Sequence, residues 1–290
     1  MNIKPINAQF SFVWITRRCN AIIAFYIFLP CLISSASDNY PAGSRAAALG
    51  GAGVMSSDLW SGYHNQAGLG FYSHLSAGAH HENMFLVPEF GLSSLALCIP
   101  TGTGTFSINY SYFGYSAYNE SKAGLGFGKA LNEIISAGIQ FDYLHTYIAD
   151  ETGNHRAFAL EAGILAKPAR NLTIGFHVFN PTHSKYIKRP DNEHIPMIFT
   201  LGAGYSYREF LFVCFETEKN LERGPVLYKG GIEYRIIPSL YARAGVNVGE
   251  FISHSFGLGI VFKKIRGDLA FSRHHVLGYT PHISLQYTIK

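Results

Sequence analysis

Histidine is the residue type in this chain with the most varied chemistry, because its ring can bind a metal or exchange a proton near neutral pH. The chain has 13 histidines, and two adjacent pairs stand out, His80–His81 and His274–His275. Neighbouring side chains of a β-strand point to opposite faces, so neither pair can chelate one ion within a regular strand. The sequence therefore predicts no metal site and no cofactor.

Two histidine–serine spacings could serve nucleophilic catalysis. His74 with Ser76, and His282 with Ser284, stand two residues apart and would share one face of a strand, as in membrane-barrel lipid hydrolases. Nothing in the sequence marks a third residue that would orient either histidine. No glycine-rich phosphate loop follows a strand and opens a helix. We therefore expect that the protein is not an enzyme.

The elements that must position these side chains are short strands with a two-residue alternation. In the expected strand at 133–147, Ile135, Ile139 and Phe141 share one face, while Gln140 and Asp142 share the other. The polar faces carry glycine and serine, whereas a soluble β-sandwich would normally carry more Lys, Glu and Arg there. The pattern predicts an all-β fold, a single-chain antiparallel transmembrane β-barrel.

About fourteen strands are expected, an even number that fits a closed barrel. The even-numbered connections are short and the odd-numbered ones are mostly longer, as in outer-membrane barrels with tight periplasmic turns. This alternation predicts a bacterial outer-membrane protein with both termini in the periplasm. The expected strands cover residues 71–80, 89–99, 104–116, 119–130, 133–147, 154–168, 171–180, 197–208, 210–219, 226–237, 239–247, 251–263, 266–275 and 279–289.

Tyrosines are expected to form girdles at the two membrane interfaces, where an aromatic ring with a polar end is favoured. One group lies near a single strand–loop junction and the other near the opposite turns. The groups are Tyr110, Tyr112, Tyr115 and Tyr118, and Tyr205, Tyr207, Tyr234 and Tyr241.

Residues 1–36 are expected to be a secretory signal peptide. The apolar run 21–33 follows Lys4, Arg17 and Arg18, and it is shorter than the roughly 18 apolar residues that a membrane-spanning helix needs. A short membrane anchor is the alternative, but Pro30 interrupts the run. Without this segment the formal net charge falls from +4 to +1, so the basic composition implies no nucleic-acid partner.

Residues 37–70 are expected to form a hatch inside a barrel of residues 71–290. A barrel of this strand number has a lumen that side chains alone do not fill. Small residues of the segment permit close approach to the inner wall, where the inward Gly124, Gly126 and Gly128 would make room. The alternative is a tail in the periplasm.

The same segment resembles the start of the FadL/PorV family of outer-membrane barrels. Members begin with G-x-R, continue with an L-G-G-A stretch and an Asp, and close with an N-P-A-G-L-like sequence before the first strand. The chain departs from this pattern at Gln66, where the family usually has proline. The resemblance implies a fourteen-stranded barrel with a hatch, and the matching residues are Gly43, Arg45, Leu49, Gly50, Gly51, Ala52, Asp58, Asn65, Ala67, Gly68 and Leu69.

Charged residues on the polar strand faces are expected inside the lumen, where they need partners or water. Arg235 and Arg243 on neighbouring strands suggest a ladder that holds the hatch or the wall. Pairing of this kind is favoured over a charged substrate path. The expected lumen-facing residues are Asp142, Glu161, Glu216, Lys229, Glu233, Arg235, Arg243 and Asp268.

Two functions follow from the resemblance. The PorV/PorQ branch implies an accessory role in protein secretion or surface attachment, whereas the FadL branch implies passive uptake of a hydrophobic small molecule. The longest expected external loop, 181–196, is polar and a poor site for an alkyl chain, but it could meet a protein or lipopolysaccharide. We therefore favour the secretion accessory, in contact with outer-membrane lipid, and keep the hydrophobic ligand for the alternative. The expected partner contacts are Lys185, Lys188, Arg189, Asp191 and Glu193.

Overall fold

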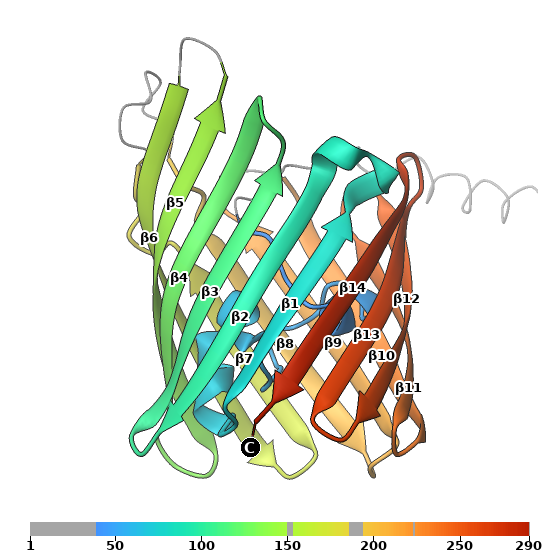
Figure 1. Cartoon of the computed structure of the whole chain (residues 1–290). Helices are drawn as coiled ribbons and strands as arrows, with labels where there is room; N and C mark the ends of the chain where they lie inside the picture. Colours follow the sequence, from blue (N-terminus) through green and yellow to red (C-terminus); the bar gives the residue numbers. More distant parts are fainter. Residues whose placement is uncertain (1–38, 150–152, 186–193, 223, 290) are drawn as a thin grey trace, which may run out of the picture.

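The chain forms a closed barrel of fourteen antiparallel strands, in which each strand pairs with its neighbours in sequence and β1 pairs with β14 (Figure 1). The predicted fold class is therefore confirmed. This computed structural model describes residues 39–149, 153–185, 194–222 and 224–289. The expected signal peptide lies outside the described residues.

The strands follow the predicted ranges closely, with one exception. The first strand was expected at 71–80, but Gln66–Phe71 forms a 3-10 helix, η1, and the strand begins at Ser76. The Asn65 side chain caps η1 by accepting a hydrogen bond from Ala67 N, which turns the chain before the wall. The strands are β1 Ser76–Asn83, β2 Gly91–Thr101, β3 Gly104–Gly114, β4 Tyr118–Ala130, β5 Ile135–Ile148, β6 Gly153–Ala169, β7 Leu172–Phe179, β8 Ile198–Tyr207, β9 Leu211–Asn220, β10 Val226–Ile237, β11 Leu240–Val248, β12 Ile252–Phe262, β13 Ile265–His274 and β14 Gly278–Thr288.

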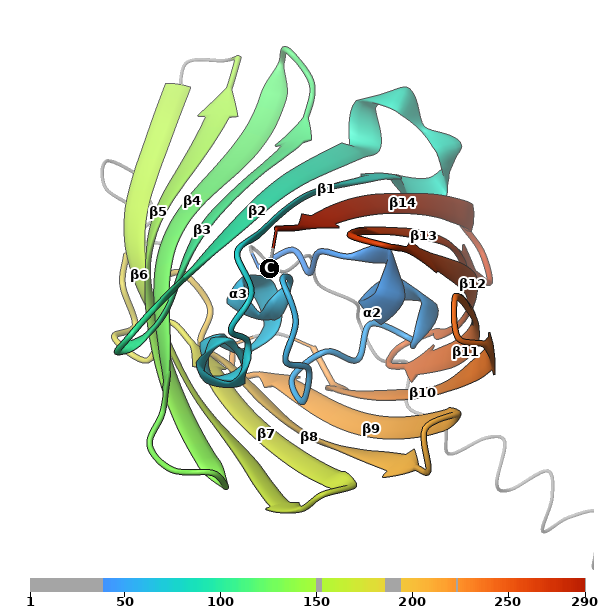
Figure 2. The same cartoon turned by 60° about the horizontal axis from the view of Figure 1, so that its bottom comes forward.

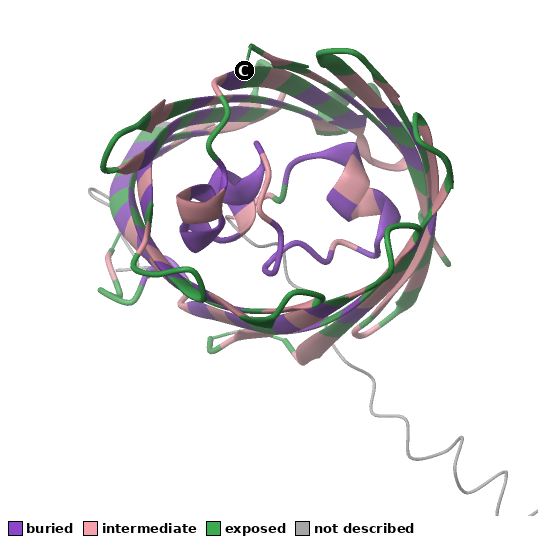
Figure 3. Ribbon diagram, turned by 90° about the horizontal axis from the view of Figure 1, so that it is seen from below, coloured by how far each residue is buried: buried purple, intermediate pink, exposed green. Residues whose placement is uncertain are grey.

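The two faces of the wall differ as the alternation predicts. On β5, the outward Ile139 and Phe141 are 57% and 53% exposed, while the inward Gln140 and Asp142 are buried. Figure 3 shows the same alternation of exposed and buried positions around the barrel. Among the described residues, no helix is long and apolar enough to cross a membrane. The exposed apolar side chains of the strands make the outward face an apolar surface, of the kind that meets lipid in outer-membrane barrels.

Residues 39–72 lie inside the lumen (Figure 2). They comprise the described part of the segment expected to form the hatch, 39–70, together with Phe71 and Tyr72, and we use the name hatch for this range. The hatch contains α2 (Ser44–Ala48), α3 (Ser61–His64) and η1. Helix α2 packs on β11 to β14, and η1 packs on β3 to β6, so the hatch bridges two sides of the wall. Two further 3-10 helices, η2 (Met84–Leu86) and η3 (Pro88–Phe90), belong to the connection between β1 and β2.

Hatch and wall meet backbone to backbone at several wall glycines, of which Gly245 and Gly138 are two. A Cβ atom built on Gly245 of β11 would stand 2.1 Å from the nitrogen of Gly50. On the other side, a Cβ on Gly138 of β5 would stand 2.3 Å from the carbonyl carbon of Gln66. No side chain larger than hydrogen fits at either position unless the hatch moves.

The three glycines predicted to make room for the hatch do so unequally. A Cβ on Gly128 would stand 2.3 Å from the carbonyl oxygen of Gln66, so this glycine admits the hatch as expected. A Cβ on Gly124 or Gly126 would instead meet wall side chains, at 2.6 Å from Asp142 Oδ1 in the case of Gly124. These two glycines make room chiefly for the polar network inside the wall.

The expected tyrosine girdle near the short turns is correct for three of its four members. Tyr205, Tyr207 and Tyr234 are 45%, 46% and 48% exposed on the outer face. The prediction is wrong for Tyr241, which shares the inner face of β11 with Arg243, and the guanidinium carbon of Arg243 lies 5.8 Å from its ring centroid. An inward ring beside an arginine cannot anchor the barrel in the interface.

Candidate functional site at the hatch

Three buried carboxylates of the wall each hold a different part of the hatch. They are Glu161 on β6, Glu216 on β9 and Glu233 on β10. Each projects into the lumen from the inner face of its strand, because the two-residue alternation sets that direction. Each also has a positively charged partner from the wall or the hatch, which a carboxylate removed from water requires.

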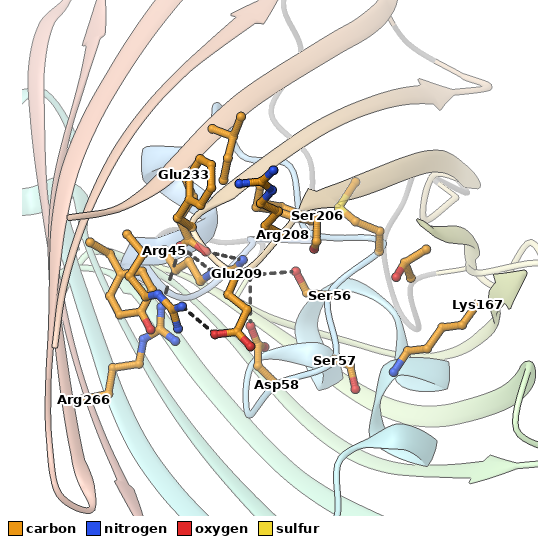
Figure 4. Close-up of a pocket in the computed structure, with 17 residues that line it drawn as sticks. Arg45, Ser56, Ser57, Asp58, Lys167, Ser206, Arg208, Glu209, Glu233 and Arg266 are labelled. Carbon is orange, nitrogen blue, oxygen red and sulfur yellow. Dashed lines mark hydrogen bonds and ion pairs between the residues drawn. The ribbon is translucent and has the colours of Figure 1, made fainter. Parts of the chain in front are cut away.

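Glu233 holds the arginine of α2. Arg45 donates two parallel hydrogen bonds to its carboxylate, from Nε and Nη2 at 2.9 Å each (Figure 4). Arg243 donates to the same carboxylate and also forms an ion pair with Asp268 at 2.8 Å. Arg45 further lies 3.6 Å from Asp58, the acidic residue of the hatch motif. This fork geometry gives both strength and a fixed orientation to α2.

Glu216 holds hatch backbone. Its Oε2 accepts hydrogen bonds from the amides of Gly53, at 2.7 Å, and Val54, at 2.8 Å. Its other oxygen accepts one from Lys229 Nζ at 2.9 Å, and that lysine also donates to Glu218 at 2.7 Å. The hatch chain is therefore tied to β9 by two charge-assisted hydrogen bonds.

Glu161 holds the residue at which the hatch departs from the family pattern. The side-chain amide of Gln66 donates to its Oε2 at 2.5 Å, where a proline would have no donor to offer. Lys122 pairs with its other oxygen, and His177 Nε2 lies 2.9 Å from Oε2. The glutamine thus contributes a hydrogen bond to the wall, and the hatch keeps its place in the lumen.

The described residues of the hatch lie between two cavities. The larger, of about 430 Å³, opens at the end of the barrel with the short turns, and Arg208, Glu209 and Arg235 are among its lining residues. The smaller, of about 210 Å³, lies toward the end with the long connections, where Ile198 and Leu227 begin β8 and β10. We call them the turn-side and the loop-side cavity.

The hatch chain between the two cavities is thin. Val54 lines the loop-side cavity, while the next residue, Met55, lines the turn-side cavity. Both side chains are buried in an apolar cluster with Leu49, Ala52 and Cys214. We call Val54 and Met55 the partition. Glu216 binds the amide of Val54, so the partition is tied to the wall at the point where it is thinnest.

The amino-terminal motif residues take four different positions in the hatch. Gly43 enters α2 with φ of 98°, a conformation that favours glycine. Gly50 donates its amide to Ser255 Oγ at 3.0 Å, and Gly51 lines the loop-side cavity. Ala52 belongs to the apolar cluster around the partition.

The carboxyl-terminal motif residues form or precede η1. Asn65 donates its side-chain amide to the carbonyl oxygens of Val54, at 2.8 Å, and Ile164, at 3.2 Å, so it links the partition to β6. Ala67, Gly68 and Leu69 are buried within η1. Asn65 of the motif thus holds the carbonyl oxygen of Val54, while Glu216 of the wall holds its amide.

A hatch histidine also faces the loop-side cavity. His64 Nε2 lies 2.8 Å from the carbonyl oxygen of Ala42 and donates to it as a neutral ring. Burial lowers the pKa of His64 below its ordinary value, which keeps this ring uncharged at neutral pH. It is therefore a fixed donor within the hatch.

The structure places the predicted lumen charges on the inner face but alters one pairing. Asp142, Glu161, Lys229, Glu233 and Arg243 are buried, and so are Glu216 and Asp268. The suggested ladder of Arg235 with Arg243 is wrong, because Arg243 stands opposite Glu233 in the register and Arg235 pairs with Glu209 at 2.9 Å near the short turns. Of the residues expected to contact a partner in the external loop, Lys185 is exposed, and its backbone forms an isolated antiparallel β-bridge with His194. The others, Lys188, Arg189, Asp191 and Glu193, lie outside the described residues.

Sequence reasoning missed two arrangements. The bonds from Glu216 to hatch amides have no sequence signature, because a backbone donor is present at every residue except proline. The second is a group of His80, Glu82 and His282. From the sequence, we considered only adjacent histidines as metal ligands. In the structure, His80 and Glu82 are two residues apart on the same face of β1, and Glu82 pairs across the strands with His282 of β14.

No protein-family model matches the chain, and no curated protein sequence matches it. Solved structures do match over most of the barrel. The CymD monoaromatic hydrocarbon channel superposes with a TM-score of 0.65 at 12% identity, over 88% of this chain and 99% of that one. The Ralstonia pickettii toluene transporter TbuX gives 0.63 at 12% identity, over 86% and 98%. A Pseudomonas aeruginosa FadL homologue gives 0.60 at 13%, over 89% and 99%.

At these identities the similarity shows the fold, which is that of the FadL-type barrels of bacterial outer membranes. The proteins matched are named as channels or transporters, in keeping with the expectation of a non-enzyme. Neither the structure nor these similarities supports the PorV/PorQ branch and its secretion partners, which we favoured from the sequence.

Proposed function

We propose that this protein is a hatch-gated passive channel that carries a small hydrophobic molecule across the outer membrane. The observation that carries the proposal is the partition, a stretch of chain with a cavity on either side. Similar structures are named as channels for monoaromatic hydrocarbons and as toluene transporters, which supports a single aromatic ring as the substrate class.

The loop-side cavity suits such a molecule in size and lining. An apolar cavity of about 150 Å³ can hold benzene, so about 210 Å³ leaves room for a substituted ring. Val54, Ile198 and Leu227 contribute apolar side chains to it, and the charged Glu216, Glu218 and Lys229, which also line it, are paired with one another. Ile198 also belongs to a buried apolar cluster with Phe179 and Ile195, toward the same end of the barrel. Burial of ring surface here would stabilise the bound state by about 25 cal/mol per Å².

Passage requires that the partition leave its place between the cavities. The two hydrogen bonds from Gly53 and Val54 to Glu216 would break, and so would the one from Asn65 to the carbonyl oxygen of Val54. Bonds to charged groups contribute about 1.5–3 kcal/mol each and a neutral one about 0.5–1.5 kcal/mol, so their loss costs about 3.5–7.5 kcal/mol and roughly one molecule in 10³ to 10⁵ would be open at a time. The rest of the hatch can remain held by Glu233 and Glu161.

The turn-side cavity suits release rather than capture. Arg45, Asp58 and Arg266 are among the charged residues that line it (Figure 4). A hydrophobic molecule gains little from a charged, solvated wall, because the charges would have to give up water. A ring that passes the partition would therefore leave toward the periplasm, where we place the short turns.

Uptake of radiolabelled toluene by intact cells tests this proposal. The host should lack hydrocarbon channels of its own, and the chain should raise the rate several-fold above the empty host. Val54→Trp fills the loop-side cavity and should return uptake to background. The control is Val213→Trp, at a position 44% exposed on the lipid face of β9, which should transport normally. Heat-modifiable mobility on a gel checks that each variant forms a barrel.

Uptake that does not rise with the wild-type chain would overturn the proposal, and so would a Val54→Trp variant that transports like the wild type. Uptake of labelled palmitate but not toluene would support the channel and replace its substrate class by alkyl chains.

A further inference from the structure

The barrel closes where β1 pairs with β14, and two histidines and a glutamate meet on the lumen side of this seam. His80 and Glu82 share the inner face of β1, and His282 of β14 is the register partner of Glu82. His282 Nδ1 lies 2.6 Å from Glu82 Oε2, and His80 Nε2 lies 3.4 Å from the same atom. One ligand atom from each residue lies within 4.8 Å of the others. We call these three residues the seam cluster.

Glu82 differs from the wall carboxylates that hold the hatch in what balances its charge. Glu161, Glu216 and Glu233 each form an ion pair with a lysine or an arginine. In the part of the chain that the structure describes, Glu82 forms ion pairs with imidazoles alone. A buried carboxylate needs a compensating charge. A divalent cation between the three side chains would supply it.

The second ring nitrogen of each histidine has a hydroxyl group beside it. Ser272 Oγ lies 3.0 Å from His282 Nε2, and Ser44 Oγ lies 3.5 Å from His80 Nδ1. Imidazoles that bind a metal nearly always use their other nitrogen in a hydrogen bond, which fixes the orientation of the ring. The seam cluster therefore has the outer contacts of a metal site as well as its ligand atoms.

We propose that the seam cluster binds one divalent transition-metal ion of the zinc class. Two imidazoles and one carboxylate form a known zinc ligand set, whereas Mg²⁺ and Ca²⁺ prefer oxygen ligands. Ligands about 2.0–2.2 Å from a tetrahedral ion stand roughly 3.4 Å apart, so small side-chain rotations would fit the ion. A water would complete the four ligands of a tetrahedral ion, as in zinc sites with three protein ligands.

A metal ion here would join the two ends of the barrel sheet to the hatch. It would link the first strand directly to the last across the seam. Ser44, which neighbours His80, also donates its backbone amide to Ser284 Oγ at 3.3 Å. Trp60 packs edge-on against the His80 ring, with the centroids 6.0 Å apart. The ion would thus steady barrel closure and the seating of α2 together.

Metal analysis of the folded protein tests the proposal. The protein is purified without a polyhistidine tag, stripped with EDTA and dialysed against Zn²⁺, Mg²⁺ or Ca²⁺ in turn. We expect one Zn²⁺ per chain and no retained Mg²⁺ or Ca²⁺. His80→Gln and His282→Gln should each weaken zinc binding by at least the 10- to 100-fold that loss of an outer contact costs. The matched control is His81→Gln, because His81 is exposed on the opposite face of β1 and should not matter.

A wild-type chain that retains no stoichiometric zinc would overturn the proposal, as would equal losses in His80→Gln and His81→Gln. If the variants fail to fold, chemical modification of the wild-type histidines gives the answer instead. Zinc should then protect His80 and His282, but not His81, from diethylpyrocarbonate. Equal modification of all three with and without zinc would count against the site. Neither result depends on whether the barrel transports toluene.

Discussion

At the scale of the residue, three wall carboxylates that are buried from water hold the hatch through three different kinds of contact. Glu233 meets a guanidinium, Glu161 meets an amide and a lysine, and Glu216 meets two backbone amides. The three attachments differ in strength because a bidentate arginine pair exceeds single hydrogen bonds to neutral donors. One of the two attachments without an arginine lies at the partition, where movement would open a path.

Removal of the charge on Glu216 should loosen the partition and little else. Glu216→Gln keeps the shape of the side chain but weakens its two hydrogen bonds to the hatch, by about 1–2 kcal/mol in sum. We expect about a tenfold higher rate of alkylation at Cys214, which is buried beside the partition, together with faster toluene uptake. Mass spectrometry of the peptide that contains Cys214 measures the rate.

The control for this variant is Glu218→Gln. Glu218 lies on the same strand and contacts the same Lys229, but it makes no contact with the partition amides that Glu216 holds. Its alkylation rate should match that of the wild type. Equal rates in all three proteins would show that Glu216 does not hold the partition closed.

At the scale of the element, the strands could be predicted from the sequence and the contacts of the hatch could not. The alternation of apolar and polar residues predicted both β5 and its inner face. A strand between lipid and the lumen places every second side chain in lipid, so its sequence shows a period of two residues. The start of β1 was misplaced because η1, a 3-10 helix of six residues, is too short to show a clear periodicity in the sequence. The register that sets Glu82 beside His282 depends on barrel closure, which a single sequence does not display.

The docking of η1 on β5 should depend on Gly138. A Cβ at this position would collide with the backbone of Gln66, so Gly138→Ala should displace the hatch and leave the barrel intact. We expect faster proteolysis within residues 39–72 in folded, heat-modifiable protein. Gly267→Ala is the matched control, because a Cβ there meets no atom within 4 Å. Equal proteolysis of the two variants would contradict the tight docking of η1.

At the scale of the whole molecule, the function that we propose differs from the one that the sequence favoured. From the sequence, the expected external loop 181–196 is polar, and binding of a hydrophobic molecule there would require its charged side chains to lose water. The features that bear on transport are instead the two cavities within the lumen and the thin chain between them. Both cavities are lined by hatch residues together with residues of several strands that lie far away in the sequence. The cavities therefore could not be predicted without the three-dimensional structure of the closed barrel.

The central claim is that movement of the partition opens the channel, and a reversible tether tests it most directly. A Cβ on Gly202 would stand 2.7 Å from Cγ1 of Val54, so cysteines at these two positions lie within reach of a disulfide. The pair is introduced with Cys98→Ser and Cys214→Ser, which prevents other pairings, and Gly202→Cys alone controls for crowding. Toluene uptake is measured before and after reduction. The account predicts background uptake while the tether is oxidised and recovery once it is reduced; equal uptake in both states would contradict it.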